Sequence, residues 1–286
     1  MLTSIELTSF RGFRQLKLEG LQRVNLIVGK NNSGKTSLLE GICEVVNSVD
    51  SRATLRQDDS TSGSWIASTE STNLNVDGQW TNDGLDAISI PKPDDFDAAY
   101  CRVSVISVYH RTPGELVPRL GKALLVAGTE ERLESILRQV DPRVKKLRID
   151  PSVPGNRIVI DVGLKRMVPL SKMGQGIYRL IEIFAEIISM TPKVCLIDEI
   201  ENGIHHSSLI DLWRGLAEIS EQFNVQIFAT THSHECIEAA HEAFSERASY
   251  GLSVIQLFRE TVSIQGRVLD QAHITAAMKG DIDLRE

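Results

Sequence analysis

Eight residues of the sequence have the types and spacing of a loop that binds phosphate groups. The run Gly29-Lys30-Asn31-Asn32-Ser33-Gly34-Lys35-Thr36 matches the pattern GxxxxGK[ST], in which backbone N–H groups cradle the phosphates of a nucleotide. Lys35 is expected to reach the β- and γ-phosphates, and Thr36 is expected to bind Mg²⁺. A fortuitous glycine-rich turn is the alternative, but the apolar run VNLIV before the loop and the helical pattern after it favour a nucleotide site.

Two acidic residues directly follow a second apolar run. Residues 194–197 read VCLI, and Asp198 and Glu199 come next, at the end of a predicted strand where open α/β sheets bind their ligands. Asp198 is expected to hold Mg²⁺ through water, and Glu199 is expected to orient and deprotonate the attacking water molecule. Many strands end in acids without a function, so the pair indicates nucleotide hydrolysis only in combination with the phosphate loop.

A histidine follows a third apolar run, QIFAT at residues 226–230. Because neighbouring parallel strands end at one edge of a sheet, His232 is expected to hydrogen-bond the γ-phosphate or the attacking water. The alternative is that His232 or His234 merely caps the helix that begins beside Ser233, a favourable N-cap residue. The predicted catalytic groups are therefore Lys35, Glu199 and His232.

The elements that must position these residues alternate along the final third of the chain. Strands are predicted over 194–197, 225–229 and 253–258, with helices over 206–223 and 233–244 between them. Such alternation is typical of an α/β fold in which helices cover a mostly parallel sheet. Further periodicity predicts helices over 35–46 and 174–190, a helical region over 113–148, and strands near 100–109, 146–149 and 158–162.

Composition excludes several classes of protein. Of the 286 residues, 42% are hydrophobic and 24% are charged, as in a globular chain rather than a disordered or collagen-like one. No run reaches the roughly eighteen apolar residues of a membrane span, and the first residues lack the apolar core of a signal peptide. The four cysteines lie far apart with no CxxC pair, which argues against a structural zinc site and indicates the reducing cytoplasm.

The net charge of −7 excludes attraction of nucleic acid over the whole surface, but the charge is unevenly distributed. Residues 102–148 contain ten Lys or Arg and five Asp or Glu, so this stretch carries +5 and the remaining residues carry −12. The basic stretch 102–148 is a candidate contact surface for nucleic acid or for an acidic partner. A solvated helical face is the alternative.

Three segments resemble the ABC-type ATPase heads of the RecF, SMC and OLD (overcoming lysogenisation defect) group of AAA-type ATP-binding proteins. They are SFRGFRQLKLEGLQRVNLIVGKNNSGKTSLLEGI near the N-terminus, LIDEIENGIHHSSLIDLW around the two acids, and FATTHSHECIEAA around His232. The form NNSGKT and the continuation ENGIH at 201–205 favour the OLD-like branch over transporter subunits.

The resemblance implies an ABC-type P-loop ATPase head with a mostly parallel central sheet, an N-terminal antiparallel β portion and an inserted helical lid. It implies one domain over 1–286, with a variable loop and β insertion at 47–97 and a helical lid subdomain at 110–165. The Toprim nuclease domain of full-length OLD proteins is not expected, because only about 50 residues follow His232. Asp281 and Asp283 are interpreted as part of a solvated tail.

The resemblance also implies a signature loop that touches the γ-phosphate of the ATP held by an opposing subunit. The matching segment is LSKMGQG at 170–176, with Ser171 and Gly174 as candidates, although its spacing departs from LSGGQ and a plain helix cap is the alternative. Arg11 is expected near the adenine or the partner interface, unless it is an ordinary surface residue. No glutamine loop is evident around residues 109–111.

The function expected from these features is that of an ATP-binding and ATP-hydrolysing switch. It would form a homodimer or higher homo-oligomer around ATP and Mg²⁺ in the cytoplasm, with no membrane contact. Its output would be the regulation in trans of an effector protein, a nuclease or another toxic enzyme, in anti-phage defence. The alternative is a RecF- or SMC-like DNA-binding ATPase of DNA repair or maintenance.

Overall fold

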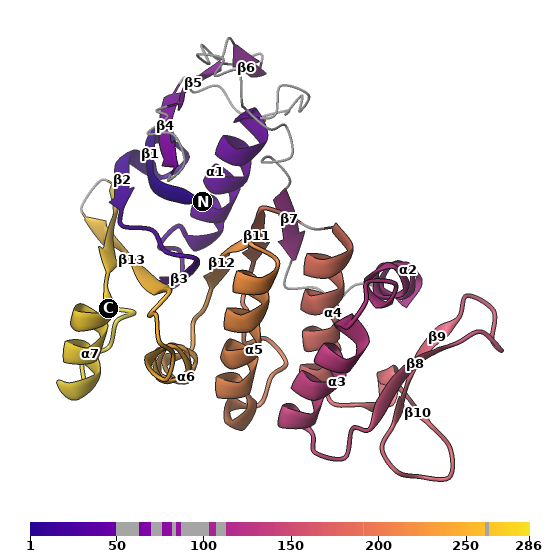
Figure 1. Ribbon diagram of the computed structural model, residues 1–286. Coiled ribbons are helices and arrows are strands. Elements are labelled where there is room, and N and C mark those ends of the chain that lie inside the picture. Colours follow the sequence, from indigo (N-terminus) through magenta and orange to yellow (C-terminus); the bar gives the residue numbers. More distant parts are fainter. Residues whose placement is uncertain are drawn as a thin grey trace.

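The computed structural model describes residues 1–49, 63–69, 76–81, 84–86, 103–106, 113–190, 192–260 and 263–286. Among them, six strands form the central sheet in the order β14–β13–β3–β12–β11–β7 (Figure 1). All neighbours pair in parallel except β13 and β14, which are antiparallel. The prediction of an α/β fold with a mostly parallel central sheet is confirmed. These strands span Val24–Val28 (β3), Val103–Ile106 (β7), Val194–Ile197 (β11), Gln226–Thr230 (β12), Leu252–Glu260 (β13) and Ser263–Leu269 (β14).

The N-terminal part forms an antiparallel sheet in the order β2–β1–β4–β5–β6. Its strands span Leu2–Phe10, Phe13–Glu19, Gly63–Thr69, Val76–Thr81 and Gly84–Asp86, for β1, β2, β4, β5 and β6. On β2, Phe13, Leu16 and Leu18 are buried while the residues between them are exposed, so one face covers a core and the other meets water. The predicted N-terminal antiparallel portion is confirmed. The segment 47–97, predicted as an insertion, contains β4 to β6, and its other residues from 50 onward lie outside the described ranges.

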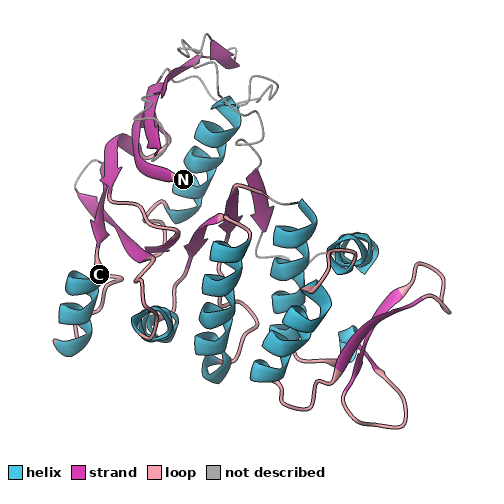
Figure 2. Cartoon of the chain, viewed as in Figure 1, coloured by secondary structure: helices cyan, strands magenta, loops and turns pink. Residues whose placement is uncertain are grey.

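Helices cover both faces of the central sheet, and each face has its own core (Figure 2). Helix α1 (Lys35–Val49) fills the space between the antiparallel sheet and one face. Helices α4 (Gln175–Met190), α5 (Leu209–Gln222) and α6 (His234–Ser245) cover the other face. On β3, Leu26 belongs to one core and Ile27 to the other, so the uninterrupted apolar run reflects burial on both faces.

The region from 113 to 172 departs in part from its expected helical character. Helices α2 (Pro113–Leu124) and α3 (Thr129–Val140) are separated by a turn in which Gly128 has a φ of 78°. Strands β8 (Lys146–Asp150), β9 (Arg157–Asp161) and β10 (Val168–Pro169) then form a small antiparallel sheet before the 3₁₀ turn η2 (Leu170–Lys172). The strands predicted near 146–149 and 158–162 are confirmed as β8 and β9. The helical region predicted over 113–148 is wrong in its extent, because it ends at Val140 and the left-handed turn at Gly128 divides it into two helices. The lid boundaries 110–165 stay a prediction.

The C-terminal region contains two elements that were not expected, β14 and helix α7 (Gln271–Lys279). Strand β14 lies at the edge of the sheet with a mixed burial pattern, so its sequence lacks the apolar run of an inner strand. After α7, Asp281 is exposed, as the interpretation of a solvated tail requires. Asp283 is half-buried and paired with Arg285, and Leu284 is only 3% exposed and belongs to the core, so the segment as a whole is not a solvated tail. Within the described residues, no helix has the length and apolar character needed to cross a membrane.

Candidate active site

The phosphate loop connects β3 to α1 and folds back over the side chain of Lys35. The Lys35 ammonium donates hydrogen bonds to the carbonyl oxygens of Gly29 (2.7 Å) and Lys30 (3.0 Å). Burial lowers the pKa of Lys35, and the nearby carboxylates of Asp198 and Glu199 oppose that shift. The cation is thus held inside the loop, beside the acids at the end of β11.

Two observations test whether this loop fits the phosphates of a nucleotide. A Cβ at Gly29 would lie 2.4 Å from the carbonyl oxygen of Leu257, and Gly29 and Gly34 have φ values of 148° and 94°. Any side chain would therefore clash, and the left-handed backbone suits glycine. The buried hydroxyl of Ser33 has no hydrogen-bond partner within the described part of the chain. A close-packed loop with an unpaired buried hydroxyl fits a bound phosphate group.

Asp198 and Glu199 follow the end of β11 in a strained turn that is hydrogen-bonded to β12. Glu199 has a φ of 47°, in the left-handed region that non-glycine residues rarely adopt. The Thr230 hydroxyl donates to Asp198 Oδ1 (2.6 Å) and accepts from the backbone N–H of Glu199 (2.8 Å). One hydroxyl of the neighbouring strand therefore orients both acids, a role that sequence reasoning missed.

His232 and Glu199 meet directly at the edge of the sheet. The His232 Nε2 lies 3.0 Å from Glu199 Oε1. The His232 side chain is 40% exposed and the Glu199 side chain is 35% exposed. The backbone N–H of His232 donates to Glu201 Oε1 (2.7 Å). Glu201 is thus a further carboxylate that shapes the site, although the sequence identified it only as part of a family-like segment.

A hollow of about 640 Å³ brings the predicted groups together. Its lining residues are Gly12, Asn31, Asn32, Gly34, Lys35, Thr36, Ser37, Asp198, Glu199, His232, Arg259 and Ile264. Arg259 on β13 was not predicted, because a single arginine in a strand has no distinguishing motif. The predicted cluster of loop, acids and histidine comes from three separate strand ends.

The oxygen atoms in this hollow suit Mg²⁺ bound together with a nucleotide. The Thr36 hydroxyl and the Asp198 carboxylate are hard oxygen donors of the kind that Mg²⁺ prefers. Among the described residues, no group of three or more His, Cys, Asp or Glu side chains could hold a metal ion. Because Mg²⁺ is commonly held by one or two protein oxygens, phosphates and water, these two donors fit that mode.

The signature-loop candidates lie away from this hollow. Ser171 in η2 and Gly174 just before α4 are exposed and are absent from the lining residues. Helix α4 nevertheless reaches the site, since the buried Arg179 donates from Nη2 to the backbone oxygen of Asp198 (3.0 Å). The structure therefore does not bring Ser171 and Gly174 together with the phosphate loop of the same chain.

Arg11 also lies outside the lining residues. Its backbone φ is 49° in the turn between β1 and β2, and its guanidinium pairs with Glu40 on α1 at 2.8 Å. The neighbouring Gly12 lines the hollow instead. A role of Arg11 in nucleotide binding stays a prediction, and the expected place of a glutamine loop, 109–111, falls outside the described residues.

The chain matches a known family over two long segments. The model of the family described as AAA ATPase domain matches residues 1–82 and 128–237. The chain belongs to the AAA ATPase domain family. It is also 22% identical over 333 aligned positions to an "ATP/GTP phosphatase" of Helicobacter pylori, an alignment that covers 86% of this chain and 89% of that protein. A shorter match, 49% identical over 41 residues, is to the "DNA replication and repair protein RecF" of Clostridioides difficile; it covers 14% of this chain and 11% of RecF.

Solved structures show the same fold. The chain is similar to the SMC head domain from Thermotoga maritima, with a TM-score of 0.59, 16% identity and coverage of 94% of this chain and 99% of that one. It is also similar to an Smc head bound to the C-winged helix domain of ScpA, with a TM-score of 0.63, 12% identity and coverage of 97% and 99%. The expected RecF- and SMC-like ABC-type ATPase is thus confirmed in fold. Membership of the AAA ATPase domain family indicates that its activity is ATP hydrolysis.

Replacing Lys35 tests the phosphate loop. Lys35→Ala removes the ammonium that the loop encloses, so we expect ATP affinity to fall more than about tenfold, or about 1.4 kcal/mol. Isothermal titration calorimetry measures this loss, and Lys35→Met serves as a second variant that preserves more of the packing. Lys17→Ala, which removes an exposed lysine paired with Glu19 on β2, is the control. Unchanged ATP binding by folded Lys35→Ala protein would contradict the assignment of the loop.

Proposed function

We propose that this ATPase is a switch that closes as a homodimer around two ATP molecules and controls an effector protein in trans. The observation that carries the proposal is the separation of the two half-sites within one chain. The hollow unites Lys35, Glu199 and His232, whereas Ser171 and Gly174 are exposed elsewhere. A second chain that presents its own exposed loop would complete each site, so the ATP-bound dimer would differ in shape from the free chain.

Within each site, the groups of one chain have distinct roles in the proposed hydrolysis. Lys35 and the loop N–H groups hold the β- and γ-phosphates, and Thr36 and Asp198 would hold Mg²⁺, which neutralises phosphate charge when bound. Glu199 accepts a proton from the attacking water while the bond between the γ-phosphorus and the bridging oxygen breaks. His232, hydrogen-bonded to Glu199, contacts the γ-phosphate or holds the carboxylate in position.

The proposed effector is a nuclease or another toxic enzyme, and the proposed setting is anti-phage defence in the cytoplasm. One similar structure is a head bound to ScpA, which supports a surface for a partner protein on this fold. The wide spacing of the cysteines in the sequence, with no CxxC pair, supports a reducing compartment. The OLD-like character of the sequence is the basis for an effector supplied by another chain.

A Glu199→Gln variant tests the chemistry. The amide keeps the shape and hydrogen bonding of the carboxylate but cannot take a proton, so turnover should fall by ~10²-fold or more while ATP binding survives. Size-exclusion chromatography with ATP and Mg²⁺ should then show a larger species than without nucleotide. Glu238→Gln on α6, an exposed carboxylate, is the matched control. A fully active Glu199→Gln protein would move the role of the base to another group, with His232 first.

Mixing two inactive variants tests whether the sites are shared between chains. Ser171→Arg should bind ATP without hydrolysing it, and Lys35→Ala should fail to bind ATP. Mixed dimers contain one site with an intact phosphate loop from the first chain and an intact signature loop from the second, so some ATPase activity should return. A mixture of Lys35→Ala with Glu199→Gln restores no complete site and is the control. No recovery in mixed dimers would mean that one chain holds the complete site.

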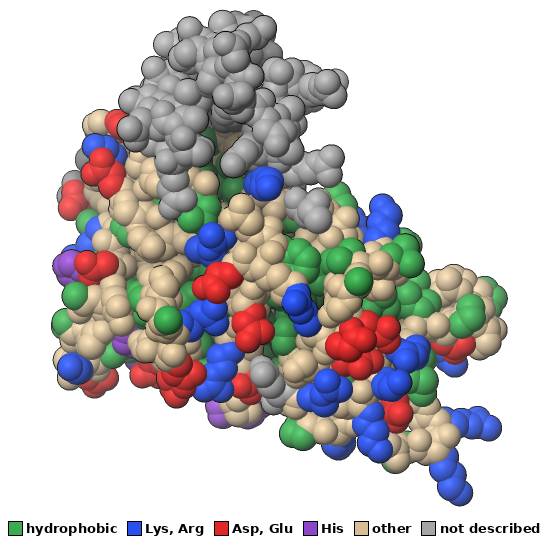
Figure 3. Space-filling view, in the orientation of Figure 1, with side chains coloured by type: hydrophobic (Ala, Val, Ile, Leu, Met, Phe, Trp, Pro, Cys, Tyr) green, Lys and Arg blue, Asp and Glu red, His purple; other side chains and the backbone are tan. Residues whose placement is uncertain are grey.

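The alternative function is that of a DNA-binding ATPase, and it depends on the basic stretch 102–148. The structure supports less free charge there than the sequence suggests, because four arginines pair with nearby acids. The pairs are Arg119–Glu186, Arg138–Glu134, Arg143–Asp141 and Arg148–Glu130. In Figure 3, acidic and basic side chains are interspersed over the part that carries α3 and β8. A short match to RecF and the SMC-like fold support this alternative.

DNA binding by the purified chain separates the two functions. If the switch proposal is right, wild-type protein should bind duplex DNA no more tightly than the double variant Lys145→Glu, Lys146→Glu. The two proteins should also have equal ATPase activity. Neither lysine has an acidic partner within the described ranges, so both would be available to phosphates. Fluorescence anisotropy over a salt series measures the affinity. A wild-type affinity at least about tenfold higher, falling steeply with salt, would favour the DNA-binding function.

A further inference from the structure

The segment that follows α7 packs onto the domain and lines a hollow beside the site. Besides the buried Leu284, the backbone N–H of Ile282 donates to the oxygen of Ala277 (2.9 Å), and Gln256 on β13 donates to the backbone oxygen of Glu286 (3.3 Å). A second hollow, next to the first, is lined by the phosphate-loop residues 29–31, by His232, and by Asp283, Arg285 and Glu286. Residues 281–286 therefore lie beside the groups that the proposed hydrolysis uses.

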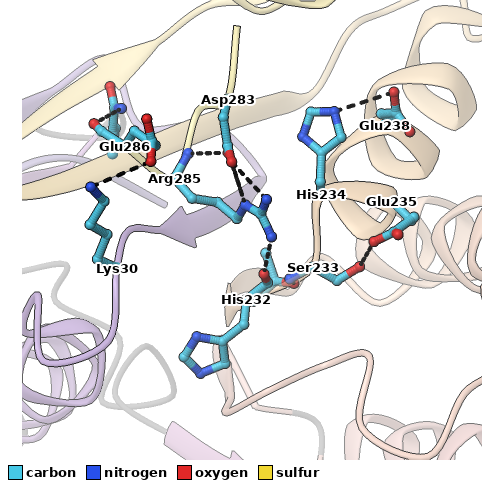
Figure 4. Close-up of polar contacts among 11 residues, drawn as sticks. Lys30, His232, Ser233, His234, Glu235, Glu238, Asp283, Arg285 and Glu286 are labelled. Atoms are coloured by element: carbon cyan, nitrogen blue, oxygen red, sulfur yellow. Dashed lines mark hydrogen bonds and ion pairs between the residues drawn. The ribbon is translucent and has the colours of Figure 1, made fainter. Parts of the chain in front are cut away.

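Arg285 is the side chain of this segment that reaches His232. Its Nη1 donates to the backbone oxygen of His232 at 2.9 Å (Figure 4). Its Nε and Nη2 are held by the carboxylate of Asp283 at 2.8 Å and 2.6 Å. The pair lowers the pKa of Asp283 to about 2, so the carboxylate stays charged at every ordinary assay pH. A guanidinium that is already fixed by two hydrogen bonds to Asp283 loses little additional conformational freedom when it makes a third, to His232.

The backbone of His232 is consequently held from both sides. Glu201 accepts from its N–H, as described above, and Arg285 donates to its carbonyl oxygen. A residue has two soft backbone dihedrals, so fixing the peptide planes before and after it fixes the direction of its Cα–Cβ bond. Figure 4 shows the imidazole pointing away from Arg285, which contacts only the backbone. The Cβ atom is thereby held where the ring, in its observed rotamer, reaches Glu199 at 3.0 Å.

We propose that Arg285 is a positioning residue for ATP hydrolysis, which acts by holding the backbone of His232 so that its imidazole meets Glu199 and the γ-phosphate. This inference rests on the role of His232 in the proposed function. The other contact of the segment with the phosphate loop, Lys30–Glu286 at 3.5 Å, joins two side chains that are 68% and 70% exposed. Such exposed pairs contribute little, so Arg285 carries the effect.

The test compares Arg285→Ala in two backgrounds. In wild-type protein, loss of the hydrogen bond from Arg285 to the backbone of His232 should lower kcat about tenfold, because a small displacement of a catalytic group slows the reaction strongly. ATP affinity should stay within about twofold, since the phosphate loop is untouched. In a His232→Ala background the same substitution should change kcat by less than about twofold, because Arg285 then has no imidazole to position. A role in stability alone would lower kcat by the same factor in both backgrounds.

Two further variants keep the test informative. Arg285→Lys keeps a positive charge but lacks the planar fork that serves Asp283 and His232 together, so it should be intermediate, and it replaces Arg285→Ala if that protein does not fold. Asp281→Asn changes an exposed residue of the same segment at a φ of 53°, which asparagine tolerates, and should leave kcat unchanged.

The outcomes separate this inference from the proposed function. An unchanged kcat in both folded Arg285 variants, or an equal loss with and without His232, would overturn the positioning role. An unchanged kcat in His232→Ala alone would overturn it as well, while Glu199→Gln and the mixed dimers still decide the proposed function. A loss confined to proteins that contain His232 supports the inference.

Discussion

The parallel pairing of β3, β12 and β11 is the constraint on which the site depends. In this register Ile27 faces Thr230 and Ile197 faces Ala229, so the three strands end within a residue or two of one another. The phosphate loop, the acid pair and His232 follow these three ends, and they meet because the strands run in the same direction. The apolar side chains of the strands pack into cores on both faces, and a shift by one residue would exchange the two faces.

Packing alone would not orient the acids at this edge. Glu199 adopts a left-handed backbone that costs of order 1–3 kcal/mol for a residue with a side chain. The hydroxyl of Thr230 and the hydrogen bond from the N–H of Ile200 to the oxygen of Thr230 (3.0 Å) hold the turn in this conformation. The strained turn directs the Asp198 carboxylate to the Thr230 hydroxyl and the Glu199 carboxylate to His232. The strained backbone thus points two adjacent carboxylates at different partners, as their proposed division of roles requires.

Connections from other parts of the chain converge on the same edge. Arg179 links α4, the helix that follows the exposed Ser171 and Gly174, to the backbone of Asp198. Arg285 links the segment after α7 to the backbone of His232. Both are arginines that bind carbonyl oxygens, and each is also held by a carboxylate, Glu182 for Arg179 and Asp283 for Arg285. A movement of α4 would therefore displace the backbone of Asp198, and a movement of the segment after α7 would displace the backbone of His232.

The sequence by itself determined the phosphate loop, the acid pair, His232 and the alternation of strands and helices, because each is encoded by neighbouring residues with a strict pattern. Sequence reasoning did not identify Thr230, Glu201, Arg259 or Arg285, which are single polar residues without a local motif. It also missed β14 and α7 and expected a solvated tail where Leu284 is buried. Thr230, Glu201 and Arg285 act through contacts with residues far apart in the chain, such as the 53 positions that separate Arg285 from His232. Only the tertiary structure could show these features, because they depend on which segments the folded chain brings next to one another.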